Sequence, residues 1–235
     1  MLDDRVIAIA GAGGGLGPVV AERLVAEGAI VAGTDRSQET LDSLAADLGL
    51  SAERWDGRAV DLLDEDATRA WCAALVERFG RVDGLLHLVG GWRGGEPLHE
   101  APLEDWALLH DLLIRTVQHT TRVFHDQLVE SAHGRFALVS AKQAQNPTNA
   151  NAAYAAAKAA AEAWALALAD GFEPGGATAN IVVVDAILTP RMREENPGKE
   201  FPTFTSAEDV AAALAFLCSD AAAKMNGQRF ALTMR

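Results

Sequence analysis

Short hydrophobic runs alternate, along almost the whole chain, with longer segments in which hydrophobic residues recur every three or four positions. The short runs are typical of buried β-strands, and the longer segments are typical of amphipathic helices. Strands are predicted at 5–10, 30–34, 84–89, 135–140, 179–184 and 228–233, with the edge of a further strand at 59–60. Helices are predicted at 16–27, 39–48, 64–79, 103–131, 152–169 and 206–218.

This alternation of strands and helices predicts βαβ units with right-handed crossovers. The expected fold class is α/β, a single-domain Rossmann fold whose doubly wound parallel sheet of about seven strands carries helices on both faces. A chain of 235 residues suits one such domain, and no linker or internal repeat divides residues 1–235.

The segment 189–205 breaks the alternation, because it is polar and contains Pro190, Pro197 and Pro202. A long loop in a compact domain often covers a site, so we predict a substrate lid in this segment. An ordinary mobile surface loop is the alternative.

A glycine-rich loop follows the first predicted strand and opens a helix. It contains Gly11, Gly13, Gly14, Gly15, Leu16 and Gly17. Glycines let the backbone approach a pyrophosphate closely, and a helix N-terminus offers unpaired N–H groups to an anion. No Gly-Lys-Ser/Thr follows, which argues against a triphosphate-binding loop. The position of the loop therefore predicts a dinucleotide site.

Two aspartates follow the next two strands. Asp35 stands where a carboxylate accepts hydrogen bonds from the adenosine ribose, which favours NAD(H) because a carboxylate repels a 2′-phosphate. Arg36 could attract that phosphate instead, so NADP(H) stays possible, and a helix cap or turn is the alternative for Asp35. Asp61 and Leu62 are placed to hold the adenine, although a turn role for Asp61 is nearly as plausible.

Tyr154 is the only tyrosine, and Lys158 lies four residues further along the predicted helix, on the same face. A neighbouring ammonium is expected to lower the pKa of a phenol, which makes it a better proton donor near neutral pH. We predict that Tyr154 and Lys158 are catalytic.

The overall composition limits the partners and the compartment. The formal net charge of −13 argues against nucleic acid or an anionic membrane as a partner, since both need clustered Lys and Arg. The N-terminus lacks a signal-peptide pattern, and no hydrophobic run suits a membrane span. Cys72 and Cys218 are isolated and typical of buried thiols in a reducing compartment, so a cytoplasmic location is expected. The histidines form no ligand pattern, and no metal is expected.

These features together resemble the short-chain dehydrogenase/reductase family over essentially the whole chain. The resemblance implies hydride transfer at C4 of a nicotinamide, with Tyr154 as acid/base and Lys158 on the nicotinamide ribose. It also implies that the cofactor contacts Val89, Gly90, Gly91, Ser140, Ile187 and Thr189. Family members pair through two long helices, so a homodimer or homotetramer is expected here through the helices that begin at Leu103 and Ala152.

The chain departs from the family pattern at two catalytic positions. The serine that polarises the substrate carbonyl is replaced by Ala141, with Ser140 one residue short, and the usual asparagine is replaced by Leu113. A reductase and a dinucleotide-binding sensor or scaffold without catalysis therefore both remain open. Survival of Tyr154 and Lys158 favours the enzyme.

Local stretches are similar to the dihydropteridine reductase branch of this family, which also has alanine at the serine position. They run from Val89 to Gly95, from Ser140 to Lys142, and from Leu188 to Met192. This similarity implies a small, flat heterocyclic substrate, with carbonyl and quinone substrates also possible. Trp92, Ala141, Lys142 and Asp185 are the expected substrate contacts. Simple packing for Trp92 and a turn or capping role for Asp185 are the alternatives.

Overall fold

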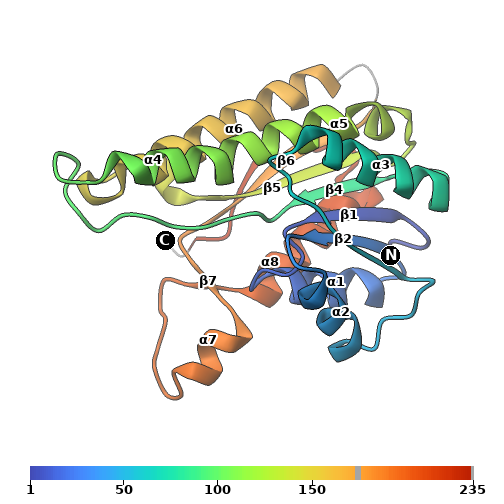
Figure 1. Ribbon diagram of the computed structural model, residues 1–235, viewed down its shortest axis with the longest axis horizontal. Coiled ribbons are helices and arrows are strands. Elements are labelled where there is room, and N and C mark those ends of the chain that lie inside the picture. Colours follow the sequence, from blue (N-terminus) through green and yellow to red (C-terminus); the bar gives the residue numbers. More distant parts are fainter. Residues whose placement is uncertain (173–175, 234–235) are drawn as a thin grey trace.

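The computed structural model describes residues 1–172 and 176–233, which build a parallel sheet of seven strands in the order β3-β2-β1-β4-β5-β6-β9 (Figure 1). The chain moves outward from β1 in one direction and from β4 in the other, which confirms the doubly wound fold. The strands are β1 (Val6–Ala10), β2 (Ile30–Asp35), β3 (Trp55–Ala59), β4 (Gly84–His87), β5 (Arg135–Ala141), β6 (Thr178–Val184) and β9 (Arg229–Ala231).

Helices cover both faces of this sheet (Figure 1). The lower layer in Figure 1 holds α1 (Gly17–Ala26), α2 (Gln38–Asp47) and α8 (Ala207–Cys218). The upper layer holds α3 (Glu65–Phe79), α4 (Leu103–His110), α5 (Thr116–Glu130) and α6 (Ala152–Phe172). Each layer packs its own hydrophobic cluster against the sheet, with Val20, Leu24 and Leu214 in one and Trp71 and Phe124 in the other. Burial on both faces explains the nearly continuous hydrophobic runs of the central strands.

The predicted helix 103–131 is interrupted. A π-helical turn, Asp111–Arg115, joins α4 to α5, and it carries Leu113, whose side chain is buried. Such turns occur mostly as single insertions in α-helices and frequently lie at functional sites. The hydrophobic period spans the interruption, so the sequence pattern does not reveal it.

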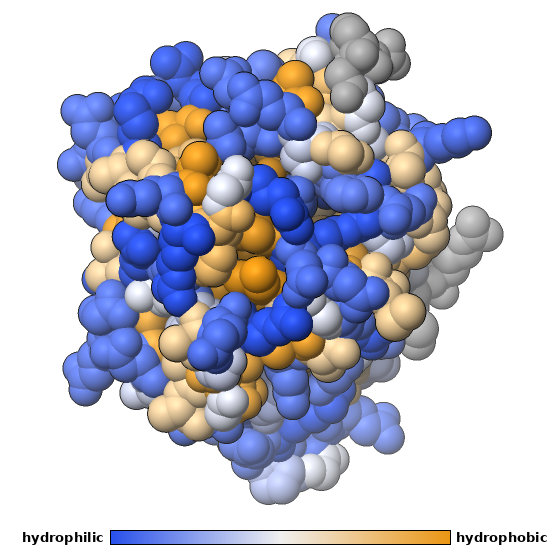
Figure 2. Space-filling model, turned by 90° about the vertical axis from the view of Figure 1, so that its right-hand side faces the viewer, coloured by the Kyte–Doolittle hydropathy of each residue, from blue (hydrophilic) through white to orange (hydrophobic). Residues whose placement is uncertain are grey.

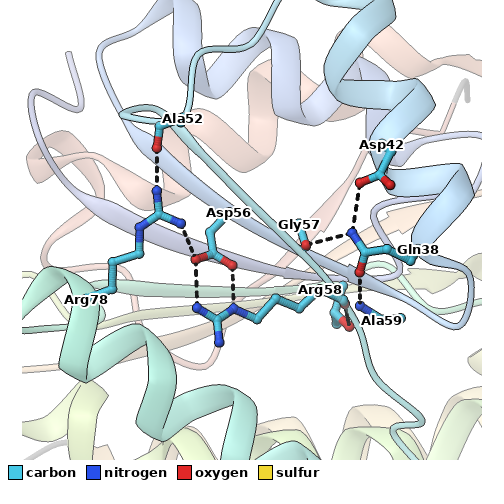
Figure 3. A network of polar contacts seen from close by, with 9 residues as sticks. Gln38, Asp42, Ala52, Asp56, Gly57, Arg58, Ala59 and Arg78 are labelled. Carbon is cyan, nitrogen blue, oxygen red and sulfur yellow. Dashed lines mark hydrogen bonds and ion pairs between the residues drawn. The ribbon is translucent and has the colours of Figure 1, made fainter.

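The predicted edge of a strand at 59–60 is wrong in its bounds, because β3 runs from Trp55 to Ala59 and ends where the prediction begins. Polar residues in the strand hide its period, and a polar network satisfies them (Figure 3). Asp56 accepts hydrogen bonds from Arg58 Nε at 2.7 Å and Arg78 Nη1 at 2.5 Å. Gln38 donates to the Gly57 carbonyl at 3.0 Å and accepts from Ala59 N at 2.9 Å, so a side chain replaces a neighbouring strand at this edge.

Most other boundaries fall within one to three residues of the predicted ones. One of these differences is at β4, which was predicted to reach residue 89 and ends at His87, although Leu88 N still donates to the Ala10 carbonyl of β1 at 2.9 Å. The predicted lid segment is not a plain loop, because it contains the short helix α7 (Pro190–Glu195). It lies between two short paired strands, β7 (Ile187–Leu188) and β8 (Thr205–Ser206). Its role as a lid stays a prediction.

The outer surface is mainly polar. Figure 2 shows the side of the molecule that lies at the right in Figure 1, where hydrophilic residues surround smaller hydrophobic patches. Cys72 and Cys218 are buried free thiols, as predicted. None of the helices in the described ranges is long and apolar enough to cross a membrane.

Candidate active site

A cleft of about 620 Å³ opens above the carboxyl ends of β1, β2 and β4. Its walls include most of the predicted cofactor-binding residues, namely Gly11, Gly14, Gly15, Leu16, Asp35, Arg36, Asp61, Leu62, Val89, Gly90, Gly91, Ile187 and Thr189. Ligands of open α/β sheets bind at the point where the strand order reverses. In this fold that point lies between β1 and β4, so the topology and the glycine loop select the same place.

Gly11 shapes the floor of this cleft. Its φ of +89° lies in the left-handed region, and a Cβ there would come within 2.9 Å of the Val89 backbone nitrogen. Any side chain would therefore strain the turn and close the approach to the backbone. Leu16, the N-cap of α1, makes no side-chain capping bond. Gly17 N donates to the Gly14 carbonyl at 3.1 Å and Pro18 has no N–H, so the start of the helix offers an anion its dipole rather than these two groups. These observations fit a dinucleotide pyrophosphate.

Gly13 and Gly17 were also predicted to contact the cofactor; neither lines the cleft in this structure, and their contacts stay a prediction. A Cβ on Gly13 would lie 2.8 Å from Asp35 Oδ2, and a Cβ on Gly17 would overlap the Ala12 carbonyl oxygen. Both glycines are needed for close packing of the loop against its neighbours. Close packing of a helix on a strand is itself one of the functions of glycine in such loops.

Asp35 is not a helix cap, since Ser37 caps α2 by accepting a hydrogen bond from Thr40 N at 3.2 Å. The Asp35 carboxylate accepts a hydrogen bond from Arg36 N at 2.7 Å and lies on the cleft wall. Asp61 combines both of its expected roles, because its carboxylate accepts from Leu63 N at 3.0 Å in a turn and also lines the cleft.

A second cavity of about 480 Å³ adjoins the cleft and shares the wall formed by Leu16, Leu88–Gly91 and Ile187. Tyr154 and Lys158 both line it, together with Trp92 and Asp185. The Trp92 side chain is 56% exposed, so it is not a core residue. The structure thus brings the predicted catalytic pair and two predicted substrate contacts to one cavity beside the glycine loop.

Burial shifts the pKa of both residues of the predicted catalytic pair. It raises the pKa of Tyr154 to about 12 and lowers the pKa of Lys158 to about 8, although the Glu162 carboxylate opposes the second shift. The expected lowering of the tyrosine pKa by Lys158 is therefore wrong for the protein without ligands. Lys158 Nζ donates a hydrogen bond to the Val139 carbonyl at 2.9 Å, which fixes the ammonium against β5.

The other contacts expected at the end of β5 stay predictions. Ala141 is 2% exposed and does not line the cavity. Ser140 lies on the cavity wall, but its hydroxyl donates to Glu162 Oε1 at 2.7 Å and is directed away from a ligand. Lys142 lies outside the cavity wall and reaches Asp185 Oδ1 at 3.6 Å.

Sequence reasoning missed three polar residues near the site. Gln143 is partly buried and lines the same cavity as Tyr154. Glu162 lies under Lys158, where Arg229 Nε donates to its Oε2 at 2.7 Å. His87 hydrogen-bonds Thr116 and Thr120 at 3.2 Å each, and its pKa falls to about 3 through burial and the charge of Lys158. The spacing of Tyr154, Lys158 and Glu162 along one helix face was the one available signal for Glu162.

Side chains that could hold a metal do not gather in the described ranges, where no group of three or more His, Cys, Asp or Glu residues meets. The doubly wound sheet, its glycine cradle and the adjoining tyrosine–lysine cavity instead define a dinucleotide-binding oxidoreductase site.

Comparison with known proteins supports this class of protein. The family model of the short chain dehydrogenases matches residues 5–200. The chain is 28% identical over 235 residues to the D-threitol dehydrogenase of Mycolicibacterium smegmatis, covering 96% of this chain and 90% of that protein. It is 30% identical over 237 residues to the meso-2,3-butanediol dehydrogenase of Serratia marcescens, covering 96% and 91% of the two.

A solved structure agrees as well. A short-chain type dehydrogenase/reductase from Mycobacterium ulcerans superposes with a TM-score of 0.89 at 26% identity, covering 98% of this chain and 88% of that one. The chain belongs to the short-chain dehydrogenase/reductase family, and it is an oxidoreductase whose cleft takes a nicotinamide dinucleotide.

Proposed function

We propose that this protein is an NADH-dependent reductase of a small, flat, conjugated acceptor. A quinonoid dihydropterin-like heterocycle is the first candidate, and carbonyl and quinone compounds are the others. The observation that carries the proposal is the single cavity in which Tyr154, Lys158 and the exposed ring of Trp92 adjoin the glycine cleft. An indole ring suits stacking against a flat ligand.

Tyr154 is placed to deliver a proton. Burial raises its pKa to about 12, so it is a neutral phenol at neutral pH and holds the proton that a reduced acceptor needs. The bound dinucleotide would supply the hydride, and the acceptor would gain one hydride and one proton in all. Lys158 is held by the Val139 carbonyl and is the residue that would contact the nicotinamide ribose.

The missing hydroxyl at Ala141 supports a nitrogen-containing acceptor. Reduction of a C=N bond with protonation on nitrogen develops less oxyanion than reduction of a carbonyl, so an oxyanion donor matters less. Ser140 does not replace the missing group, because its hydroxyl is bound to Glu162. The cavity therefore suits a heterocycle better than a simple ketone.

Removal of the phenol hydroxyl tests the proposal. We expect Tyr154→Phe to lower the rate of NADH oxidation at least tenfold, the usual order for loss of a general acid, with NADH affinity changed by less than about threefold. NADH absorbance would follow turnover with quinonoid dihydropterin and with a panel of quinones and carbonyls.

Ala156→Ser, an exposed position on the same helix, is the matched control and should keep wild-type turnover. Undiminished turnover in Tyr154→Phe would refute the role of the phenol.

A second candidate function is cofactor binding without catalysis, as in a sensor or scaffold. Ala141 and the buried Leu113 favour it, since neither supplies a polar group to the cavity. Tight NADH binding by the wild-type protein without turnover of any acceptor in the panel would support this candidate and contradict the reductase.

We also propose that copies of the chain associate through the outer faces of α5 and α6. A shallow cavity of about 500 Å³ on these faces includes Thr121, His125 and Trp164, and the Trp164 side chain is 36% exposed. Charged side chains of both signs surround this indole, and an exposed aromatic ring within such a rim suits packing of helices across a two-fold axis.

A further inference from the structure

Two polar residues that stand at neighbouring strand ends share one wall of the catalytic cavity. In the sheet, Ala141 of β5 pairs with Val184 of β6. Asp185 is the residue directly after Val184, and Gln143 comes two residues after Ala141. Adjacent strands lie about 4.8 Å apart, so the backbones of the two residues start from neighbouring positions at this edge of the sheet. Both line the cavity that contains Tyr154.

The Gln143 amide is incompletely satisfied. Its Oε1 is buried and has no hydrogen-bond partner within the described part of the protein. An unmade hydrogen bond on a buried acceptor costs about 1–3 kcal/mol, and such groups in native structures call for an explanation. A ligand in the cavity that donates an N–H supplies one, once the amide turns its buried oxygen toward the cavity.

The Asp185 carboxylate is in a similar state. Its side chain is 19% exposed, and its one ion pair among the described residues is the contact with Lys142 Nζ at 3.6 Å. Lys142 is 47% exposed and reaches the carboxylate from outside the cavity wall. An ionised carboxylate has about four acceptor positions, so the contact with Lys142 leaves most of this capacity for a ligand in the cavity that Asp185 lines.

The last two residues of β5 supply no donor to these acceptors. Ala141 has no hydroxyl, and the Ser140 hydroxyl donates to Glu162 at 2.7 Å. We propose that Asp185 and Gln143 form an acceptor wall that selects substrates with two adjacent N–H groups. An amino-substituted pyrimidinone ring, as in a pterin, has such an edge and can give a carboxylate two parallel hydrogen bonds.

This inference rests on the proposed function and names the recognition element of its substrate. Trp92 lies on the same cavity, so the acceptor wall orients the edge of a flat ring while the indole covers its face. A site built to accept hydrogen bonds from a ligand rejects the analogue that lacks the donors, because its buried acceptors are then left unpaired.

Two commercially available ring systems separate this chemistry from general affinity for flat rings. Pterin carries an amino group at C2 next to N3–H, whereas lumazine carries a carbonyl at C2 and loses the adjacent donor pair. We expect the wild-type protein with saturating NAD⁺ to bind pterin at least about tenfold more tightly than lumazine, by isothermal titration calorimetry.

Two substitutions test whether Asp185 and Gln143 cause the preference for pterin over lumazine. Asp185→Asn should bring the two affinities within about threefold of each other, because an amide offers one donor in place of an acceptor. Gln143→Leu keeps the volume, removes the acceptor and should weaken pterin binding about fivefold, with lumazine changed less. Lys142→Gln removes the ion pair from outside and should leave pterin binding equal or tighter.

NADH titration and circular dichroism of each variant separate loss of recognition from loss of folding. Equal binding of pterin and lumazine by the wild-type protein, or a preference that survives Asp185→Asn, would overturn the acceptor wall. NADH-dependent reduction of a simple quinone under the same conditions would leave the proposed reductase standing. Absence of all turnover, with the pterin preference intact, would refute the reductase and support the wall.

Discussion

Asp35 shows how one carboxylate can set the choice of cofactor. It lies at the end of β2 on the cleft wall, and its oxygen also accepts from Arg36 N. A carboxylate there binds ribose hydroxyls and repels a 2′-phosphate, so we expect the wild-type protein to bind NADH more tightly than NADPH. Asp35→Asn should weaken NADH binding about tenfold. It should also bring the affinities for NADH and NADPH within about threefold of each other, because the carboxylate no longer repels the 2′-phosphate.

Fluorescence titration with both dinucleotides measures these affinities. Asp47 is an exposed carboxylate on α2, away from the cleft. Asp47→Asn removes the same charge as Asp35→Asn and should bind both dinucleotides as the wild-type protein does. A wild-type protein that binds NADPH more tightly would assign the decisive role to Arg36 instead.

At the scale of elements, the start of α1 depends on contact between backbones. A Cβ on Gly17 would overlap the Ala12 carbonyl oxygen, so α1 could not keep its place on the sheet. We expect Gly17→Ala to reduce the free energy of unfolding by about 3 kcal/mol, the upper range for overpacking, in urea titrations.

Gly14→Ala is the matched variant, because a Cβ there meets only the Gly11 carbonyl oxygen at 3.4 Å. It should unfold at nearly the wild-type urea concentration and instead weaken NADH binding, since Gly14 lines the cleft. Equal stability of the two variants would contradict the packing role of Gly17.

For the whole molecule, the buried His87 links stability to pH. A free histidine binds a proton near pH 6.5, whereas burial and the charge of Lys158 lower the pKa of His87 to about 3. The unfolded chain therefore binds one more proton than the folded one between these values, and stability falls as the pH drops through this window. From pH 8 to pH 5.5 this group should reduce the free energy of unfolding by about 1.4 kcal/mol.

His87→Gln should remove that part of the pH dependence while keeping a polar side chain near Thr116 and Thr120. Urea unfolding at the two pH values measures this change in the free energy of unfolding. His99, whose side chain is 73% exposed, provides the control, and His99→Gln should keep the pH dependence of the wild-type protein. An unchanged pH dependence in His87→Gln would refute the assignment.

Most of the fold and much of the site could be predicted because the signals are local. Hydrophobic period distinguishes strands from helices, and a glycine loop between the first strand and helix predicts the cleft that the structure contains. Predictions failed where a local pattern says nothing of distant contacts. The polar strand β3 is held by Gln38 and Arg78 from other elements, and the π turn lies inside an unbroken hydrophobic period.

The sequence by itself determined the order of strands and helices, the glycine cradle and the pair of Tyr154 and Lys158, since each depends on spacing along the chain. Only the tertiary structure decided that the Ser140 hydroxyl turns to Glu162 and that Gln143 and Asp185 line the same cavity. The physical reason is that strand order and register bring together residues far apart in sequence, and burial then sets which of their polar groups remain for a ligand.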